Sequence, residues 1–316
     1  MRTTAVSGER QHSSMPVPSI QGSILRLLLR FRKAITNWNA PVATFRAKAK
    51  WSDRFTRLPR DVEFKPLMAA NVPVEWISPL GVSFQTVVLY IHGGGGTLGW
   101  YNIERRMVAY IAKAASSRAL AMDYRLAPEY PFPAALEDCL GTYHWLLSNG
   151  TPAQSIVITG SSAGGNLALA TLMSLRDAGD QLPAAAVCLS PVTDLKGTGD
   201  SFTTNNDPAV SATFALSMAR QYAGNQDMRA PLLSPNYGDL RGLPPLLIQV
   251  GGDEIVLSDA TRLADNARAA GVDVKLVIWP KMWHAWQLFV PHLPEARHAV
   301  SDIGTFIRER TTALEK

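Results

Sequence analysis

The chain has 316 residues, 47% of them hydrophobic and 18% charged, which is the balance of a globular protein large enough to bury a core without disulfides or metals. Its formal charge of +5 is uneven, because residues 1–60 hold 12 Lys and Arg against two acidic residues, a balance of +10 that leaves −5 for residues 61–316. A basic excess confined to one end, without a zinc-finger spacing or a basic-aromatic RNA motif, predicts that the chain binds no nucleic acid.

The N-terminal region, residues 1–50, is interpreted as a polar tail followed by cap helices. Over residues 19–37, apolar residues recur at helical spacing with arginines between them. One interpretation is a helix that lies on a membrane surface. We favour a helix that covers part of the body and shields a pocket, because helical periodicity by itself indicates one buried face.

No targeting segment is expected in this region. The apolar run at residues 24–29 is short, contains Arg26 and is followed by further basic residues, unlike a secretory signal peptide. No stretch of the sequence approaches the roughly 20 apolar residues that span a bilayer. We therefore expect a cytoplasmic protein without stable insertion into a membrane.

Residues 51–316 are expected to form one catalytic domain in which strands and helices alternate. Short apolar runs predict strands at residues 72–77, 86–91, 119–123, 155–159, 185–190, 246–250 and 274–279. Amphipathic stretches predict helices at residues 104–115, 134–147, 165–178, 259–270 and about 295–310. Several strands are continuously apolar, which indicates cover on both faces. The alternation predicts an α/β fold with a mostly parallel central sheet and helices on both faces.

Residues 196–229 interrupt this alternation. The stretch is rich in Gly, Thr and Asn, then becomes helical, and shows no clear strand. We expect an insertion here that forms a helical cap over the site together with the N-terminal helix.

A glycine run follows the strand predicted at residues 86–91, from His92 to Gly96. Glycines let backbone N–H groups approach a substrate closely, and such donors stabilise the oxyanion of acyl transfer. A flexible loop and a phosphate cradle are the alternatives, but a phosphate loop would continue into Lys and Ser or Thr, and no Lys follows here.

A G-x-S-x-G motif lies where the strand at 155–159 meets the next helix, with Gly160, Ser162 and Gly164 at its fixed positions. In so tight a turn, side chains two residues before and after the serine would collide, so glycine is required there. The five residues alone would also fit a simple Gly/Ser loop. Their strand-to-helix setting favours a nucleophile elbow that presents the Ser162 hydroxyl at a helix N-terminus.

With further motifs in the same order, the chain resembles the bacterial hormone-sensitive-lipase-like esterases, which have the α/β-hydrolase fold. The resemblance spans about residues 72–306 and rests on HGGG at 92–95, DYRLAPE at 123–129, PFPAA at 131–135, GSSAGG at 160–165, SPVTDL at 190–195 and GLPP at 242–245. It implies that the amides of Gly94, Gly95 and Ala163 bind the oxyanion. It also implies that His92, Asp123 and Glu129 brace the loops around them.

Two positions depart from the pattern of the family. Between the glycine and the serine of the elbow the family usually has Asp or Thr, and Ser161 is similar to the Thr-type subgroup. The aromatic residue that often follows the three glycines is Gly96 here, which suggests a wider or looser acyl side of the pocket.

The serine needs a base, because its hydroxyl is a weak nucleophile until a proton is removed. In this fold the chain order is Ser, acid, His. Of six histidines, His284 lies in the loop after the last predicted strand, where the fold places its base, and the nearby His292 lacks that position. We predict His284 as the general base.

The acid is expected after the strand at 246–250, where three carboxylates compete. Alignment with the family motif places the acid at Glu254, and the Thr-type subgroup often carries Glu there. Asp253 is the second choice, since either carboxylate could orient an imidazole and stabilise its charged form. Asp259 is interpreted as the N-cap or first turn of the next helix.

The predicted activity is hydrolysis of carboxylic esters with short acyl chains, through an acyl-enzyme on Ser162. No metal and no organic cofactor are implied, the partner is a small-molecule ester, and the resemblance suggests a homodimer. Amide or lactone hydrolysis would use the same residues. A membrane-associated lipase, and an inactive ligand-binding protein similar to the plant gibberellin receptors, remain as alternatives. Cys139 and Cys188, without a CxxC motif, are expected to be reduced and structural.

Overall fold

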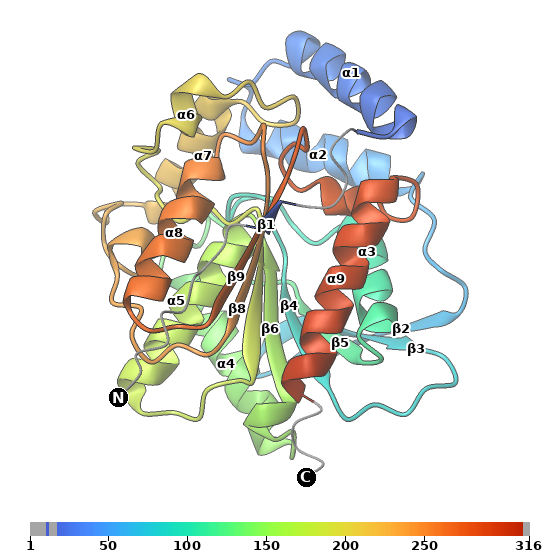
Figure 1. Ribbon diagram of the computed structural model, residues 1–316, viewed down its shortest axis with the longest axis vertical. Coiled ribbons are helices and arrows are strands. Elements are labelled where there is room, and N and C mark those ends of the chain that lie inside the picture. Colours follow the sequence, from blue (N-terminus) through green and yellow to red (C-terminus); the bar gives the residue numbers. More distant parts are fainter. Residues whose placement is uncertain (1–10, 13–17, 312–316) are drawn as a thin grey trace, which may run out of the picture.

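The computed structural model describes residues 11–12 and 18–311, which form a central sheet with helices on both faces (Figure 1). Most of the predicted polar tail, residues 1–10 and 13–17, lies outside the described residues. The strands are β1 (Gln11–His12), β2 (Val62–Ala69), β3 (Val72–Pro79), β4 (Val87–Ile91), β5 (Arg118–Met122), β6 (Ile156–Ser161), β7 (Ala185–Leu189), β8 (Leu246–Gly251) and β9 (Val274–Trp279). Their order across the sheet is β1-β9-β8-β7-β6-β4-β5-β3-β2. Only the β2–β3 and β3–β5 pairs of these strands are antiparallel, so the predicted mostly parallel sheet is confirmed.

The α-helices in the described ranges follow the predicted alternation. They are α1 (Ile20–Ile35), α2 (Val42–Asp53), α3 (Asn102–Ala114), α4 (Ala134–Ser148), α5 (Ala163–Ala178), α6 (Ser201–Thr204), α7 (Ala212–Ala223), α8 (Leu257–Ala269) and α9 (Pro294–Thr311). Three short 3-10 helices are η1 (Ala153–Ser155), η2 (Pro235–Tyr237) and η3 (Trp286–Phe289). Each predicted strand and helix is present, with ends that differ by at most two residues.

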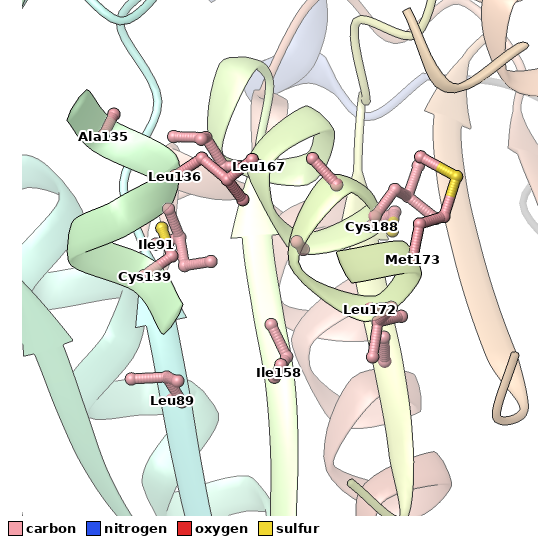
Figure 2. Close-up of a cluster of buried hydrophobic side chains, with 14 of the residues drawn as sticks. Leu89, Ile91, Ala135, Leu136, Cys139, Ile158, Leu167, Leu172, Met173 and Cys188 are labelled. Carbon is pink, nitrogen blue, oxygen red and sulfur yellow. The ribbon is translucent and has the colours of Figure 1, made fainter. Parts of the chain in front are cut away.

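The core lies in two layers, one on each face of the sheet. On β4, Leu89 and Ile91 pack with residues of α4, α5 and α8, whereas Val88 and Tyr90 pack with residues of α3 and α9. Successive strand residues point to opposite faces, so a strand covered on both sides is apolar at every position. Figure 2 shows part of the first layer, where Leu89 and Ile91 lie beside α4 and α5.

Both cysteines lie in this first layer, Cys139 on α4 and Cys188 on β7 (Figure 2). Both are buried and unpaired, as expected. Burial raises the pKa of each thiol well above its usual range, because the thiolate would lose its hydration. The two cysteines therefore act as small apolar side chains of the core.

The sequence patterns missed β2, which pairs with β3 at the edge of the sheet. This strand contains Glu63, Lys65 and Pro66, and most of its residues are not buried. Charges and proline are common on edge strands, where one side of the backbone has no neighbour to pair with. An edge strand therefore lacks the continuous apolar run by which the inner strands were predicted.

Helices α1, α2, α6 and α7 gather beyond the carboxyl ends of the parallel strands (Figure 1). The last two lie within residues 196–229. An aromatic cluster joins the N-terminal segment to α7, with the Phe45 and Phe214 ring centroids 4.3 Å apart and Trp38 5.2 Å from Phe214. Two segments far apart in the sequence are thus packed over one end of the sheet.

The preferred expectation for α1, a buried apolar face, is wrong. The five apolar residues that mark its periodicity, Ile24, Leu27, Leu28, Phe31 and Ile35, are each between 57% and 68% exposed. The helix instead contacts the body through its polar side and Leu29, so the apolar side points outward. Periodicity shows that a helix has two faces and does not show which one is covered. None of the described helices combines the length and apolar character needed to cross a bilayer.

Candidate active site

Ser162 lies in the sharp turn between β6 and α5, with backbone angles of φ 54° and ψ −116°. The neighbouring glycines permit this turn. A Cβ on Gly160 would lie 2.1 Å from the carbonyl oxygen of Gly164, and a Cβ on Gly164 would lie 2.0 Å from that of Ile91. The predicted crowding is therefore present, and part of it comes from the adjacent strand β4. The turn places the hydroxyl at the N-terminus of α5, where backbone N–H groups point outward.

His284 and Glu254 reach Ser162 from two other loops at the same end of the sheet. His284 follows β9, and its Nε2 lies 2.8 Å from Ser162 Oγ. Its Nδ1 lies 2.9 Å from Oε2 of Glu254, which follows β8. With its proton on Nδ1, the imidazole donates to the carboxylate and accepts a hydrogen bond from the serine hydroxyl. The three side chains thus form one continuous hydrogen-bonded chain.

Glu254 is fully buried, and its second oxygen is also occupied. Oε1 accepts hydrogen bonds from the backbone N–H of Gly251 at 2.6 Å and from Ser190 Oγ at 2.7 Å. These donors fix the carboxylate so that Oε2 faces His284. Both oxygens of this buried carboxylate therefore have hydrogen-bond partners, which a buried charge requires.

The other two candidate acids are engaged elsewhere. Asp253 forms an ion pair with Arg26 of α1. Asp259 lies in the first turn of α8, as expected, and accepts hydrogen bonds from the backbone N–H groups of Thr193 and Asp194 at 2.9 and 3.0 Å. Of the three carboxylates, Glu254 is therefore the one in contact with His284.

The acidic groups around His284 favour its charged form. Burial lowers the pKa of His284, but the hydrogen bond with Glu254 and the negative charges of Glu254, Asp207 and Asp259 outweigh it, so the pKa is raised overall. An imidazole with a raised pKa is a stronger base and a more stable imidazolium.

Asp207 is a neighbour that sequence reasoning missed. It is buried in the segment between α6 and α7 and accepts a hydrogen bond from the backbone N–H of His284 at 3.2 Å. Burial and the charge of Glu254 raise the pKa of Asp207 to about 6, against the opposing charge of His284. No local pattern distinguishes this aspartate from others in residues 196–229, because its partner is 77 residues away in the chain.

Asp207, Glu254 and His284 each offer a ligand atom within 4.8 Å of the others, a spacing in which a cation could be held. Both ring nitrogens of His284 are already hydrogen-bonded, one to Glu254 and one to Ser162. Neither nitrogen is left for a metal unless the serine contact breaks. The arrangement therefore suits proton transfer better than metal binding.

The glycine run forms a loop beside the serine. Gly94, Gly95 and Gly96 all have left-handed backbone angles, with φ of 96°, 65° and 67°, which L side chains rarely adopt. Within the described part of the chain, the amides of Gly94, Gly95 and Ala163 donate to no backbone or side-chain acceptor. Three unpaired N–H groups next to a nucleophile can stabilise a developing oxyanion.

Glu104 of α3 is hydrogen-bonded to the start of this loop. Its carboxylate accepts hydrogen bonds from the backbone N–H of Gly93 at 3.1 and 3.2 Å and from the Tyr90 hydroxyl at 2.7 Å. The Tyr90 hydroxyl oxygen also lies 3.1 Å from Ser161 Oγ, which links the unusual elbow residue to the same network. Burial raises the pKa of Glu104 to about 7, although these hydrogen bonds oppose the shift.

The residues implied to brace the loops contact them. The His92 ring stacks on Tyr124 with centroids 4.1 Å apart, and its Nδ1 lies 2.8 Å from the carbonyl oxygen of Gly93. Burial lowers the pKa of His92 to about 4, so the ring is neutral. Asp123 lies 3.9 Å from His92 Nε2. Glu129 pairs with Arg46 of α2 at 2.7 Å, which joins that helix to the loops.

The space between Gly96 and helix α7 is filled. A Cβ at this position would lie 2.7 Å from the Tyr222 ring of α7. An aromatic ring from a distant segment therefore fills the space beside the glycine, and a wider acyl side of the pocket stays a prediction.

A surface cavity of about 520 Å³ borders the site region. It is lined by Lys33, Phe202, Thr203, Asn205, Ala212, Thr213, Leu216, Arg220 and Ile255. Asn205 connects the cavity to the acid loop, because its side-chain amide donates to the carbonyl oxygen of Glu254 at 2.8 Å.

Comparison with known proteins gives consistent similarities. Residues 88–288 match the alpha/beta hydrolase fold family. An acetyl-hydrolase of Streptomyces hygroscopicus is 44% identical over 239 residues, which cover 75% of this chain and 80% of that protein. An esterase structure from the bacterial hormone-sensitive lipase family has a TM-score of 0.89 and 44% identity, covering 93% of this chain and 99% of that one. EstE5, in crystals soaked with p-nitrophenyl butyrate, has a TM-score of 0.88 and 40% identity, covering 93% and 99%. The range 88–288 contains every predicted site residue.

Proposed function

This chain belongs to the α/β-hydrolase fold family, among its bacterial hormone-sensitive-lipase-like esterases, and on that premise we propose which residues hydrolyse the ester and which esters they act on. The protein is a serine carboxylesterase, as the similarity to named esterases indicates. The observation that carries the assignment of residues is the hydrogen-bonded chain from Ser162 through His284 to Glu254.

In the proposed acylation step, Ser162 Oγ attacks the ester carbonyl carbon while His284 Nε2 removes the hydroxyl proton. The carbonyl oxygen becomes an oxyanion and accepts hydrogen bonds from the amides of Gly94, Gly95 and Ala163. When this tetrahedral intermediate collapses, the C–O bond to the alcohol breaks and the imidazolium gives its proton to the leaving oxygen. Glu254 holds the imidazole in the required tautomer and stabilises its charged form.

In the proposed deacylation step, a water molecule takes the place of the alcohol. His284 removes a proton from the water as its oxygen attacks the acyl carbonyl, and the same amides bind the second oxyanion. Collapse of this intermediate releases the carboxylic acid, and the proton returns to Ser162. None of these steps requires a metal or an organic cofactor.

We propose short-chain acyl esters as substrates. Two observations support this class: a relative at 44% identity is named an acetyl-hydrolase, and EstE5 was soaked with p-nitrophenyl butyrate. We further propose that residues 1–50 and about 196–229 form a cap over a catalytic domain of residues 51–316. The packing of Phe45 on Phe214 and the Arg46–Glu129 ion pair support a cap joined to the body. A homodimer and a cytoplasmic location remain predictions, to be tested by sedimentation equilibrium and cell fractionation.

The test is a series of p-nitrophenyl esters from acetate through butyrate and octanoate to palmitate. We expect kcat/KM to be highest for acetate and butyrate. Ser162→Ala should lower kcat by at least about 10⁴-fold, because the nucleophile is lost while the oxyanion amides remain. Ser174→Ala on the same helix is the matched control and should retain activity. Equal turnover by wild type and Ser162→Ala would refute the assignment of the nucleophile.

A further inference from the structure

The outward side of α1 carries a continuous apolar stripe. It consists of Ile20, Ile24, Leu27, Leu28, Phe31 and Ile35, all between 57% and 77% exposed, and we call it the outer stripe. These residues are three or four apart, so they share one face of the helix. Figure 1 shows α1 as the outermost helix beyond the carboxyl ends of the strands, with α2 between it and the sheet.

The opposite side of α1 is attached to the protein by polar contacts along its whole length. Ser19 Oγ donates to Glu295 Oε2 at 2.9 Å, Arg26 pairs with Asp253, and Lys33 Nζ donates to the carbonyl oxygen of Asp207 at 2.7 Å. Turning the outer stripe inward would break these contacts and bury charged groups. The apolar side is therefore held outward by the fold.

The segment of the chain that carries the outer stripe is strongly basic. Residues 18–60 contain ten Lys and Arg side chains and one acidic side chain, Asp53. Arg30 and Arg32 on α1, and Lys48, Lys50 and Arg54 on or next to α2, are exposed. An apolar face with exposed arginines on its own helix, in a basic segment of the chain, is complementary to a surface that is apolar beneath and negatively charged on top.

We propose that the outer stripe of α1 binds the surface of a membrane that contains anionic lipids, with the helix parallel to the membrane plane. A second copy of this chain fits the same stripe less well. In a symmetric dimer through α1, the two basic segments would face each other, and like charges brought together repel. An anionic lipid surface pairs these cations with opposite charges.

This attachment would place the active site next to the membrane. Arg26 pairs with the residue that precedes Glu254, and Lys33 contacts Asp207, which accepts a hydrogen bond from the backbone of His284. Lys33 also lines the cavity of about 520 Å³ with the apolar side chains of Leu216 and Ile255. We infer that esters dissolved in the membrane surface reach the enzyme at this end, an inference that rests on the proposed function.

The test is sedimentation of the full chain with vesicles. One set contains equal parts of phosphatidylcholine and phosphatidylglycerol, and the other contains phosphatidylcholine alone. The double variant Leu28→Glu/Phe31→Glu changes the outer stripe, and Leu80→Glu/Val82→Glu is the matched control, with the same charge change at two other exposed apolar residues (61% and 45%). Circular dichroism checks that both variants fold, and hydrolysis of soluble p-nitrophenyl acetate checks their active sites.

We expect wild type and the control variant to sediment with the anionic vesicles at least about tenfold more than with phosphatidylcholine, and binding to weaken as salt rises. The outer-stripe variant should lose this binding and keep its activity on the soluble ester. Wild type that stays in the supernatant, or an outer-stripe variant that binds equally well, would overturn the proposal. The proposal would also be overturned if wild type bound no vesicles and the outer-stripe variant lost a dimer that wild type forms. The stripe would then bind a second copy of the chain. Failure of the proposed function is separate, because it would appear as absent turnover of the soluble ester.

Discussion

Ser190 Oγ donates a hydrogen bond to Glu254 Oε1 over 2.7 Å, at the carboxylate oxygen that does not contact the His284 ring. Together with the Gly251 amide, this contact leaves Oε2 as the oxygen that meets the imidazole. The orientation of the proposed acid is therefore set before substrate binds.

The first prediction concerns the identity of the acid. In Glu254→Gln, the side-chain NH₂ can donate to His284 Nδ1, which forces the proton onto Nε2 and removes the base from Ser162. We expect kcat to fall by about 10³- to 10⁴-fold, as expected for a wrong tautomer. Asp253→Asn loses only its partly exposed ion pair with Arg26 and should change kcat by less than about threefold. Steady-state kinetics on p-nitrophenyl butyrate distinguishes the two, and loss of turnover only in Asp253→Asn would reverse the assignment.

The second prediction concerns the acidic limb of the pH profile of kcat/KM, where activity rises with pH. His284 acts as a base only when it is neutral, and its pKa is raised by Glu254 and the neighbouring carboxylates despite burial. Activity should therefore rise with pH through an inflection above the ordinary pKa of histidine. Measurement of kcat/KM by pH-stat titration with a soluble ester gives this value. An inflection at or below the ordinary pKa of histidine would contradict the electrostatic argument.

A third prediction tests Asp207 as a positioning residue for His284. The substitution Asp207→Asn removes a negative charge that raises the pKa of His284. It also replaces the carboxylate that accepts from the His284 backbone N–H with a weaker, neutral acceptor. We expect the acidic limb to move to lower pH and kcat to fall by about tenfold, which corresponds to ~1.4 kcal/mol. The exposed Asp200, in the same segment, provides the matched control Asp200→Asn. A fall in kcat without any movement of the limb would indicate a merely structural role.

A fourth prediction concerns stability and Glu104. Burial raises its folded-state pKa to about 7 from an ordinary value of 4.5, so between these pH values the folded state binds more protons than the unfolded state. The free energy of unfolding should therefore decrease as pH rises from about 4.5 to 7, by an amount on the order of 2–3 kcal/mol from this group.

Glu104→Gln should remove this part of the pH dependence, because the amide does not titrate and its carbonyl oxygen can still accept from Gly93. Urea unfolding of both proteins at pH 5 and pH 8 provides the comparison. Asp207 and Asp259, whose pKa values are also raised by burial, affect both proteins alike and cancel in the difference. An equal pH dependence in the two proteins would show that Glu104 does not titrate in this range.

The sequence alone determined the alternation of inner strands and helices, because a strand buried on both faces is apolar at every position and a covered helix is amphipathic. It also located the turn at Ser162, since only glycines fit where a Cβ would lie about 2 Å from a backbone carbonyl. These features depend on residues close together in the chain, so a local pattern is enough to identify them.

Only the tertiary structure decided the features that depend on distant segments. It brought Glu254 rather than Asp253 to His284, placed Asp207 against the backbone of His284, and filled the space beside Gly96 with Tyr222. It also turned the apolar side of α1 outward. Periodicity reports the two sides of a helix or strand, whereas the side that becomes buried depends on what the rest of the chain brings to it. Here polar contacts from three distant loops and from the start of α9 hold the charged side of α1 against the body.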